Sequence, residues 1–97
     1  MEFGEILRQL RHESGQGIKR LAPELGVNYS YLSKLETGAI NPSAEFVSRV
    51  ASYFGYDENR LLLSAGKVPD EIISILRKNP DEAIAYLRDR FGGEVGK

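Results

Sequence analysis

The sequence predicts an all-α fold. Apolar residues recur at intervals of three and four along most of the 97 residues, as expected for helices that bury one face. Turns rich in glycine, proline, serine or asparagine separate these stretches, and no stretch shows the two-residue alternation of a half-buried strand. With 41% hydrophobic residues, the chain can bury one modest helical core, so we expect one compact domain with a short appendage.

The first two helices follow from apolar spacing and glycine-containing turns. The first helix ends at about Glu13, because Ser14-Gly15-Gln16-Gly17 stops it. The second runs from about Ile18 to Leu25. Pro23 lies inside it, lacks an N–H and can clash with the carbonyl of Lys19, so we expect a slight kink or a 3₁₀ start. The apolar positions of the first helix are Phe3, Ile6, Leu7 and Leu10.

A third helix follows a tight turn. Gly26 comes just after the second helix, where a left-handed backbone suits glycine, and Asn28 can cap the next helix with its side-chain oxygen. This third helix spans about Tyr29 to Glu36 and ends at Gly38. Two short helices joined in this way form a helix-turn-helix, whose second helix usually enters a DNA groove. The apolar residues that the two helices would bury are Leu21, Ala22, Leu25, Leu32 and Leu35.

Two more helices complete the N-terminal part. Ser43 is the expected N-cap of a fourth helix, and Gly55 closes it. Asp57 caps a short leucine-rich fifth helix that breaks near Gly66. The apolar residues of the fourth helix are Phe46, Val47, Val50, Ala51 and Phe54.

Beyond Gly66 the pattern predicts a two-helix extension. Pro69 and Asp70 suit a first helical turn, Asn79-Pro80-Asp81-Glu82 restarts a helix, and Gly92-Gly93 ends it. The extension carries more apolar side chains than a small core needs. They could fold back on the first helix, form a dimer seam, or bind another protein. The residues expected at a dimer interface are Ile72, Ile75, Leu76, Ile84, Leu87 and Phe91.

Several features occur together and in register in the first two thirds of the chain. They are Arg11 four residues before Gly15, Leu21-Ala22, Gly26-Val27, Tyr31-Leu32-Ser33-Lys34-Leu35-Glu36 with Gly38 beyond it, Asn41-Pro42-Ser43, and Gly55 before an acid-capped leucine-rich helix. Over about residues 3 to 64, this arrangement resembles the XRE family of bacterial and phage repressors. The resemblance implies a five-helix, repressor-like helix-turn-helix DNA-binding domain in residues 1–66. It fades beyond that point, and we expect residues 67–97 to be a dimerisation segment with a flexible tail.

The third helix has one polar outer face. A rotation of 100° per residue places one group of residues inside and a polar group opposite, with Tyr29 on the flank at the N-terminal end. The inner residues are Leu32, Leu35, Asn28 and Glu36, and the opposite residues are Ser30, Ser33, Lys34 and Thr37. The resemblance implies that this helix reads bases, and the chemistry is suitable: asparagine pairs with adenine, lysine with guanine, serine with either, and a tyrosine ring can touch a thymine methyl. The alternative is a solvated surface helix. The implied base-reading residues are Asn28, Tyr29, Ser30, Ser33 and Lys34.

Phosphate contacts are expected at the edges of the motif. The start of the second helix offers free N–H groups and a favourable dipole. Family members often carry Ser or Thr followed by Gln there, whereas this chain has Gly17 and Ile18, so the usual glutamine contact is missing. Lys19 and Arg20 could equally be solvated charges. The expected backbone-contacting residues are Ile18, Lys19, Tyr31 and Asn41.

The resemblance also implies an internal ion pair. In the family, an arginine of the first helix pairs with the glutamate that ends the third helix, and these positions are Arg11 and Glu36 here. The planar guanidinium suits a carboxylate. The alternative is two independent surface charges. We expect His12, beside Arg11, to be a surface residue.

Composition limits the remaining classes of function. Thirteen basic and fourteen acidic residues give a net charge of −1, which argues mildly against nucleic acid, although a basic stripe on one face is compatible with this balance. Without cysteine and with one histidine, we expect no metal or cofactor, and no nucleophile–base pair or phosphate loop indicates an enzyme.

Three hypotheses remain after these exclusions. The leading one is a dimeric transcriptional regulator, a repressor that binds a pseudo-palindromic double-stranded operator in the major groove. The second is an antitoxin or a regulatory interaction module whose C-terminal helices bind a protein partner. An enzyme is the least supported. The N-terminus has acidic Glu2 and Glu5 instead of a basic region before an apolar run, so we expect a cytoplasmic protein.

Overall fold

The computed structural model describes residues 1–95, with side chains up to Gly92. The chain forms two compact units, Met1–Lys67 and the residues from Val68 onward. Every regular element of the described residues is a helix, so the all-α prediction is confirmed. None of these helices is long and apolar enough to cross a membrane.

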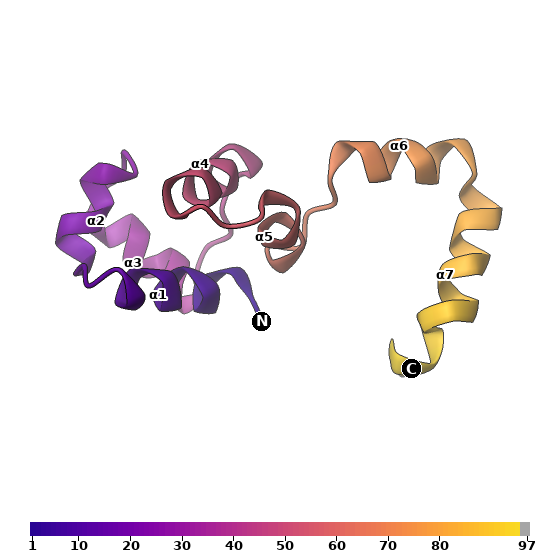
Figure 1. Ribbon diagram of the computed structural model, residues 1–97, viewed down its shortest axis with the longest axis horizontal. Helices are drawn as coiled ribbons and strands as arrows, with labels where there is room; N and C mark the ends of the chain where they lie inside the picture. The colour runs from indigo at the N-terminus through magenta and orange to yellow at the C-terminus, as the bar shows by residue number, and fades with distance from the viewer. Residues whose placement is uncertain (96–97) are drawn as a thin grey trace. The chain divides into compact units, whose positions relative to one another are not determined.

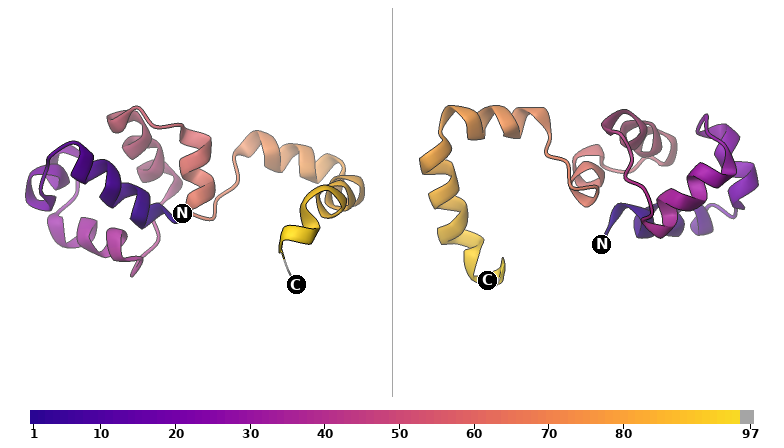
Figure 2. Two further views of the ribbon diagram at one scale, coloured as in Figure 1. Left: turned by 60° about the horizontal axis from the view of Figure 1, so that its bottom comes forward. Right: turned by 180° about the vertical axis from the view of Figure 1, so that it is seen from behind.

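Five helices make up the N-terminal unit (Figure 1). Both α1 and α2 pack on α3, while α5 packs on α4 and also contacts α1. Figure 2 shows this unit from two further sides, with α1 next to α3. The predicted ends of the first four helices agree with the observed ones to within a residue, and the fifth helix ends at Ser64, two residues before the predicted break near Gly66. The helices are α1 (Phe3–Glu13), α2 (Ile18–Glu24), α3 (Tyr29–Thr37), α4 (Ala44–Phe54) and α5 (Glu58–Ser64).

The helix starts follow the capping residues that the sequence indicates. The side-chain oxygens of Asn28, Ser43 and Asp57 each accept the backbone N–H three residues later, at 2.8, 3.1 and 2.9 Å. Each cap satisfies one of the N–H groups that a helix leaves without a partner, which contributes about 1 kcal/mol. Gly26 has the predicted left-handed backbone, with a φ of 76°. Local sequence therefore determines where α3, α4 and α5 begin.

The second helix differs slightly from the expectation. It is α-helical over Ile18–Glu24 and includes Pro23, without a separate 3₁₀ segment. The predicted 3₁₀ start is limited to a single hydrogen bond of the 3₁₀ type, from the N–H of Arg20 to the carbonyl of Gly17 at 3.2 Å. The same carbonyl also accepts the α-helical hydrogen bond from the N–H of Leu21 at 3.0 Å. The proline falls in the last turn, where only the carbonyl of Lys19 loses its helical donor.

One hydrophobic core occupies the centre of the N-terminal unit. Gly4 allows α1 to approach the end of α3 closely, because a Cβ at this position would lie 2.6 Å from the backbone oxygens of both Leu35 and Glu36. The buried apolar residues are Phe3, Ile6, Leu7, Leu21, Ala22, Leu25, Leu32, Leu35, Phe46, Val47, Val50, Ala51, Leu61 and Leu62.

The C-terminal unit consists of α6 (Asp70–Lys78) and α7 (Pro80–Val95), which pack on each other. The predicted end at Gly92-Gly93 is wrong, because α7 continues to Val95. Glycine lowers helix stability by about 1 kcal/mol but stops a helix only when it takes a left-handed cap conformation. Gly92 is not among the glycines with positive φ, so it remains part of the helix.

Candidate nucleic-acid interface

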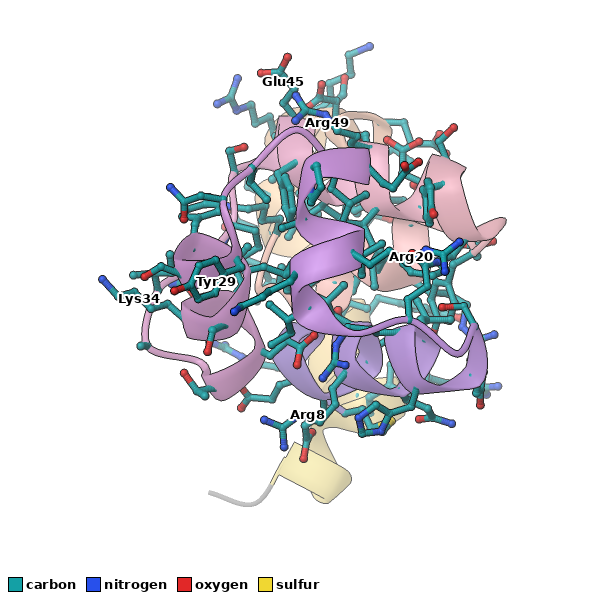
Figure 3. All side chains as sticks on the ribbon, turned by 90° about the vertical axis from the view of Figure 1, so that its left-hand side faces the viewer. Arg8, Arg20, Tyr29, Lys34, Glu45 and Arg49 are labelled. Carbon is teal, nitrogen blue, oxygen red and sulfur yellow. The ribbon has the colours of Figure 1, made fainter. Side chains whose placement is uncertain are left out.

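The third helix separates a buried face from an exposed polar face. Leu32 and Leu35 are 0% and 1% exposed, respectively, and anchor α3 in the core. On the opposite side, the side chains of Tyr29, Ser30 and Lys34 are exposed. Figure 3 shows Tyr29 and Lys34 on the same side of the unit, with Lys34 extending away from it. The core therefore fixes α3 from behind and leaves this polar face free.

Asn28 has the predicted capping role in the structure. Its Oδ1 accepts the backbone N–H of Tyr31 at 2.8 Å and so caps α3. A bidentate contact with adenine needs this same oxygen as the acceptor for the base amino group. The cap uses one lone pair of Oδ1, so the second lone pair and the NH₂ group take no part in it.

The beginning of α2 lies against the outer face of α3. The Nζ atom of Lys19 is 5.3 Å from the ring centroid of Tyr29, within the range of a cation–π contact. This contact holds a positive charge beside the base-reading candidates. A groove of about 580 Å³ lies between the two helices and is lined by Gly17, Ile18, Lys19, Tyr29, Ser30, Ser33 and Lys34.

Among the other backbone-contact candidates, Ile18 lines this groove, whereas Tyr31 and Asn41 lie apart from it. The side chain of Ile18 packs against the core, so only its N–H could face a phosphate. The ring of Tyr31 meets Phe46 edge-on, with centroids 5.9 Å apart and an interplanar angle of 84°. Asn41 is exposed in the link between α3 and α4, where it lines a different depression together with Met1. The structure therefore brings Lys19 to the predicted reading face, but not Tyr31 or Asn41.

Arg11 and Glu36 form an ion pair that joins α1 to the end of α3. The Nε and Nη2 atoms of Arg11 donate to the two carboxylate oxygens of Glu36, at 2.6 and 2.9 Å. The side chain of Glu36 is only 1% exposed. Hydrogen bonding to Glu36 raises the pKa of Arg11, so the guanidinium stays charged. Arg11 also donates to the carbonyl of Gln16, at 3.1 Å, which ties the following turn to the pair.

Two arginines contribute contacts that sequence reasoning missed. Arg8 lies one helical turn before Arg11, and its Nε is 3.4 Å from Glu36 Oε1, so it is a second, more exposed partner of this carboxylate. Its spacing from Arg11 on α1 is the signal that could have indicated this. Arg49 of α4 donates from Nη1 to the carbonyl of Leu25 at 2.8 Å, a contact that only the tertiary structure brings about.

Other charged residues lie outside the candidate interface. In Figure 3, Arg20 and Lys34 point to opposite sides of α2, so Arg20 does not extend the polar face of α3.

The described residues contain no group of three or more His, Cys, Asp or Glu side chains that could hold a metal ion.

Comparison with known proteins agrees with this geometry. The profile of a family described as "Helix-turn-helix domain" matches residues 2–63, which include α1 to α4 and most of α5. The chain belongs to this helix-turn-helix domain family. The match confirms the resemblance to XRE-type regulators in the part of the chain where the sequence motifs occur.

Relatives of this helix-turn-helix domain are bacterial regulators. The chain is 34% identical over 85 residues to the HTH-type transcriptional regulator DdrOP3 of Deinococcus deserti, covering 88% of this chain and 66% of the relative. It is 46% identical over 51 residues to the HTH-type transcriptional regulator SlrR of Bacillus subtilis, covering 52% and 34%. Identity to SinR of Bacillus subtilis is 35% over 61 residues, covering 62% and 55%. The matches thus span from about a third to about two thirds of the relatives' length.

Proposed function

We propose that this chain binds double-stranded DNA sequence-specifically and regulates transcription, as a dimeric repressor of a pseudo-palindromic operator. The observation that carries the proposal is the exposed polar face of α3, which contributes little to the fold and lies on a helix fixed by the core. In a helix-turn-helix, this is the helix that enters the major groove. The names of the relatives support the same function and a non-enzymatic role.

Base contacts are assigned to the exposed side of α3. Lys34 can donate to guanine O6 and N7, Ser30 and Ser33 can donate or accept, and the ring of Tyr29 can contact a thymine methyl. Asn28 can donate from its NH₂ group and can also accept with the second lone pair of the oxygen that caps the helix. Together these residues span the first two turns of α3, the part of such a helix that usually lies closest to the bases.

Contacts with the DNA backbone are assigned mainly to Lys19. Its ammonium group lies beside the Tyr29 ring, on the edge of the groove between α2 and α3. Ile18 lines the same groove, but its side chain packs against the core, so it could offer only its backbone N–H. Tyr31 and Asn41 are weaker candidates, because neither lines this groove. Phosphate contacts set the orientation of the protein on DNA, whereas the α3 contacts select the sequence.

The C-terminal unit is proposed to join two copies of the chain. α6 buries none of its residues, and Ile72, Ile75 and Leu87 are 39%, 52% and 44% exposed. α6 also begins with acidic residues, Asp70 and Glu71, and ends with basic ones, Arg77 and Lys78. If two α6 helices lie antiparallel across a two-fold axis, each acidic start meets a basic end of the partner copy. The other residues assigned to this seam are Leu76, which is half-buried here, Ile84 and Phe91.

The proposal is tested by selecting duplexes from a random library with the full chain, then measuring affinity for the selected and a scrambled duplex. A sequence-specific regulator should prefer the selected site by a factor of about 10³ or more, with affinity falling as salt rises. Equal affinity for both duplexes at every salt concentration contradicts it.

Light scattering of the same preparation tests whether the chain is a dimer. A stable complex with a different protein would instead support the alternative function as an interaction module. Since its proposed partner is operator DNA, we propose that the protein acts in the cytoplasm.

A further inference from the structure

Arg49 connects α4 to the turn between α2 and α3. Its Nη1 donates to the backbone carbonyl of Leu25 at 2.8 Å, and its Cζ lies 5.8 Å from the ring centroid of Phe46 on the same helix. Glu45 lies nearby on α4 (Figure 3), yet among the described residues the guanidinium bonds to the carbonyl and forms no ion pair with this carboxylate. The guanidinium is thus held between an aromatic ring and the turn.

The carbonyl of Leu25 needs a donor from outside its own helix. At the end of α2, the N–H of Gly26 donates to Pro23 and that of Val27 donates to Ala22, at 3.1 and 3.0 Å. This Schellman arrangement satisfies two earlier carbonyls but leaves the one at the helix end. Arg49 supplies the donor. It lies so close to the turn that a Cβ on Gly26 would be 3.2 Å from its Nη1.

The same helix, α4, also contacts the first turn of α3. The ring of Phe46 meets that of Tyr31 edge-on, so Phe46 supports α3 while Arg49 supports the end of α2. Between α4 and the turn lies a groove of about 690 Å³, lined by Pro23, Gly26, Val27, Asn28, Tyr31, Ser43, Phe46 and Arg49. The two side chains therefore fix both ends of the helix-turn-helix junction across this groove.

We propose that Arg49 is a positioning residue for α3, which sets the direction of the reading helix and thereby the selectivity for DNA sequence without touching DNA. This inference rests on the proposed function. An arginine that binds a phosphate strengthens binding to every duplex and increases the salt dependence. An arginine that orients α3 strengthens only the contacts between α3 and the bases, because these require a defined direction of the helix. It therefore raises affinity for the selected duplex alone.

The experiment compares Arg49→Met with Arg49→Lys. Both replacements are unbranched, but only lysine keeps a positive charge that could lie near the Phe46 ring and donate to the Leu25 carbonyl. The control is Arg60→Ala, which removes a positive charge from an exposed position of α5. Affinities for a selected and a scrambled duplex are measured at several salt concentrations. We expect Arg49→Met to lower the ratio of the two affinities about tenfold at an unchanged salt slope. Arg49→Lys should recover part of this loss, and Arg60→Ala should leave the ratio unchanged.

Amide hydrogen exchange of the free protein provides a readout that needs no DNA. The Val27 N–H should exchange about tenfold faster in Arg49→Met than in the wild type, because the turn opens more often without its outside donor. Unchanged exchange at Val27 overturns the inference. Equal losses on both duplexes, with a salt slope smaller by about one, also overturn it, because they identify a phosphate contact. If the wild type binds both duplexes equally, the proposed function is overturned instead. The exchange rate of the Val27 N–H in Arg49→Met and in the wild type then decides whether Arg49 holds the turn.

Discussion

The two units of this chain differ in how far their apolar side chains are buried. In the N-terminal unit, Leu21, Leu32 and Leu61 are each 0% exposed and belong to one core. In the C-terminal unit, α6 buries no residue, and Ile75 and Phe91 are 52% and 50% exposed. Burial of a leucine contributes about 2 kcal/mol, so the first unit has a source of stability that the second lacks. The N-terminal unit thus has a core of its own, whereas the C-terminal unit leaves an apolar face exposed, which the proposed dimer would cover.

The strongest test of the N-terminal unit removes its buried ion pair. Arg11→Ala leaves the carboxylate of Glu36, which is 1% exposed, with only the longer contact from Arg8. We expect the free energy of unfolding to fall by about 3 kcal/mol, as for other broken buried pairs. Arg8→Ala is the matched control and should cost about 0–1 kcal/mol, because the Arg8 side chain is 53% exposed. Urea denaturation measures both, and equal losses would contradict the difference in burial.

This ion pair also makes a prediction about pH. The pKa of Arg11 is raised in the folded state, so its contribution to stability is fully present below its ordinary pKa and is lost only as the pH rises through the raised value. The difference in stability between wild type and Arg11→Ala should therefore be the same at neutral and mildly alkaline pH. A difference that shrinks over this range would show that another group titrates at the pair.

A second test concerns the close approach of α1 and α3. Gly4→Ala places a methyl group 2.6 Å from two backbone oxygens of α3, which cannot rotate away as a side chain could. We expect a loss of about 2 kcal/mol, since overpacking forces the backbone to move. Gly17→Ala is the control, because its surroundings are open and its φ of −83° suits alanine. Thermal melts that do not separate the two variants would show that α1 can shift without cost.

The C-terminal unit is tested by a charge on its exposed apolar face. Ile75→Glu should shift the full chain from dimer to monomer and lower operator affinity about a hundredfold, because two linked half-sites bind far more tightly than one. The melting of the N-terminal unit should not change. Ser74→Glu adds the same charge to a neighbouring exposed position and is the control. If Ile75→Glu remains dimeric by light scattering, the dimer interface lies elsewhere in the chain.

The smallest expected effects concern the reading face itself. Lys34→Ala and Ser30→Ala should each weaken binding to the selected duplex about tenfold while the melting temperature stays the same. Both side chains are exposed and contribute little to the core. Comparison with a scrambled duplex distinguishes base contacts from phosphate contacts, which would weaken both equally. Unchanged affinity for both duplexes would contradict the proposal that α3 lies in a DNA groove.

Features that depend on neighbouring residues were predictable from the sequence, and features that depend on packing were not. Asn28 and Gly26 adopt the predicted cap and turn, because their preferences act within a few residues of the chain. The need for glycine at position 4 arises from a helix more than 30 residues later, and the contact of Arg49 with Leu25 spans 24 positions. No local pattern marks such pairs.

The same reasoning explains the outcome for the candidate site. Helical periodicity predicted which side of α3 is exposed, but it did not indicate that Lys19 would lie over Tyr29 or that Tyr31 would pack against Phe46. Those placements depend on the angles between helices, which the core determines. The end of α7 differed for another reason: consecutive glycines weaken a helix without requiring it to stop.

The cap at the start of α3 has a consequence for how Asn28 could meet a base. The Oδ1 atom of Asn28 accepts the N–H of Tyr31 at 2.8 Å with one lone pair, and its second lone pair can still accept the amino group of an adenine. Turning the amide away from the cap would cost about 1 kcal/mol, so the cap holds the side chain in one orientation. A base at this end of the helix would therefore meet an amide that is already oriented before DNA binds, which reduces the side-chain entropy lost on contact.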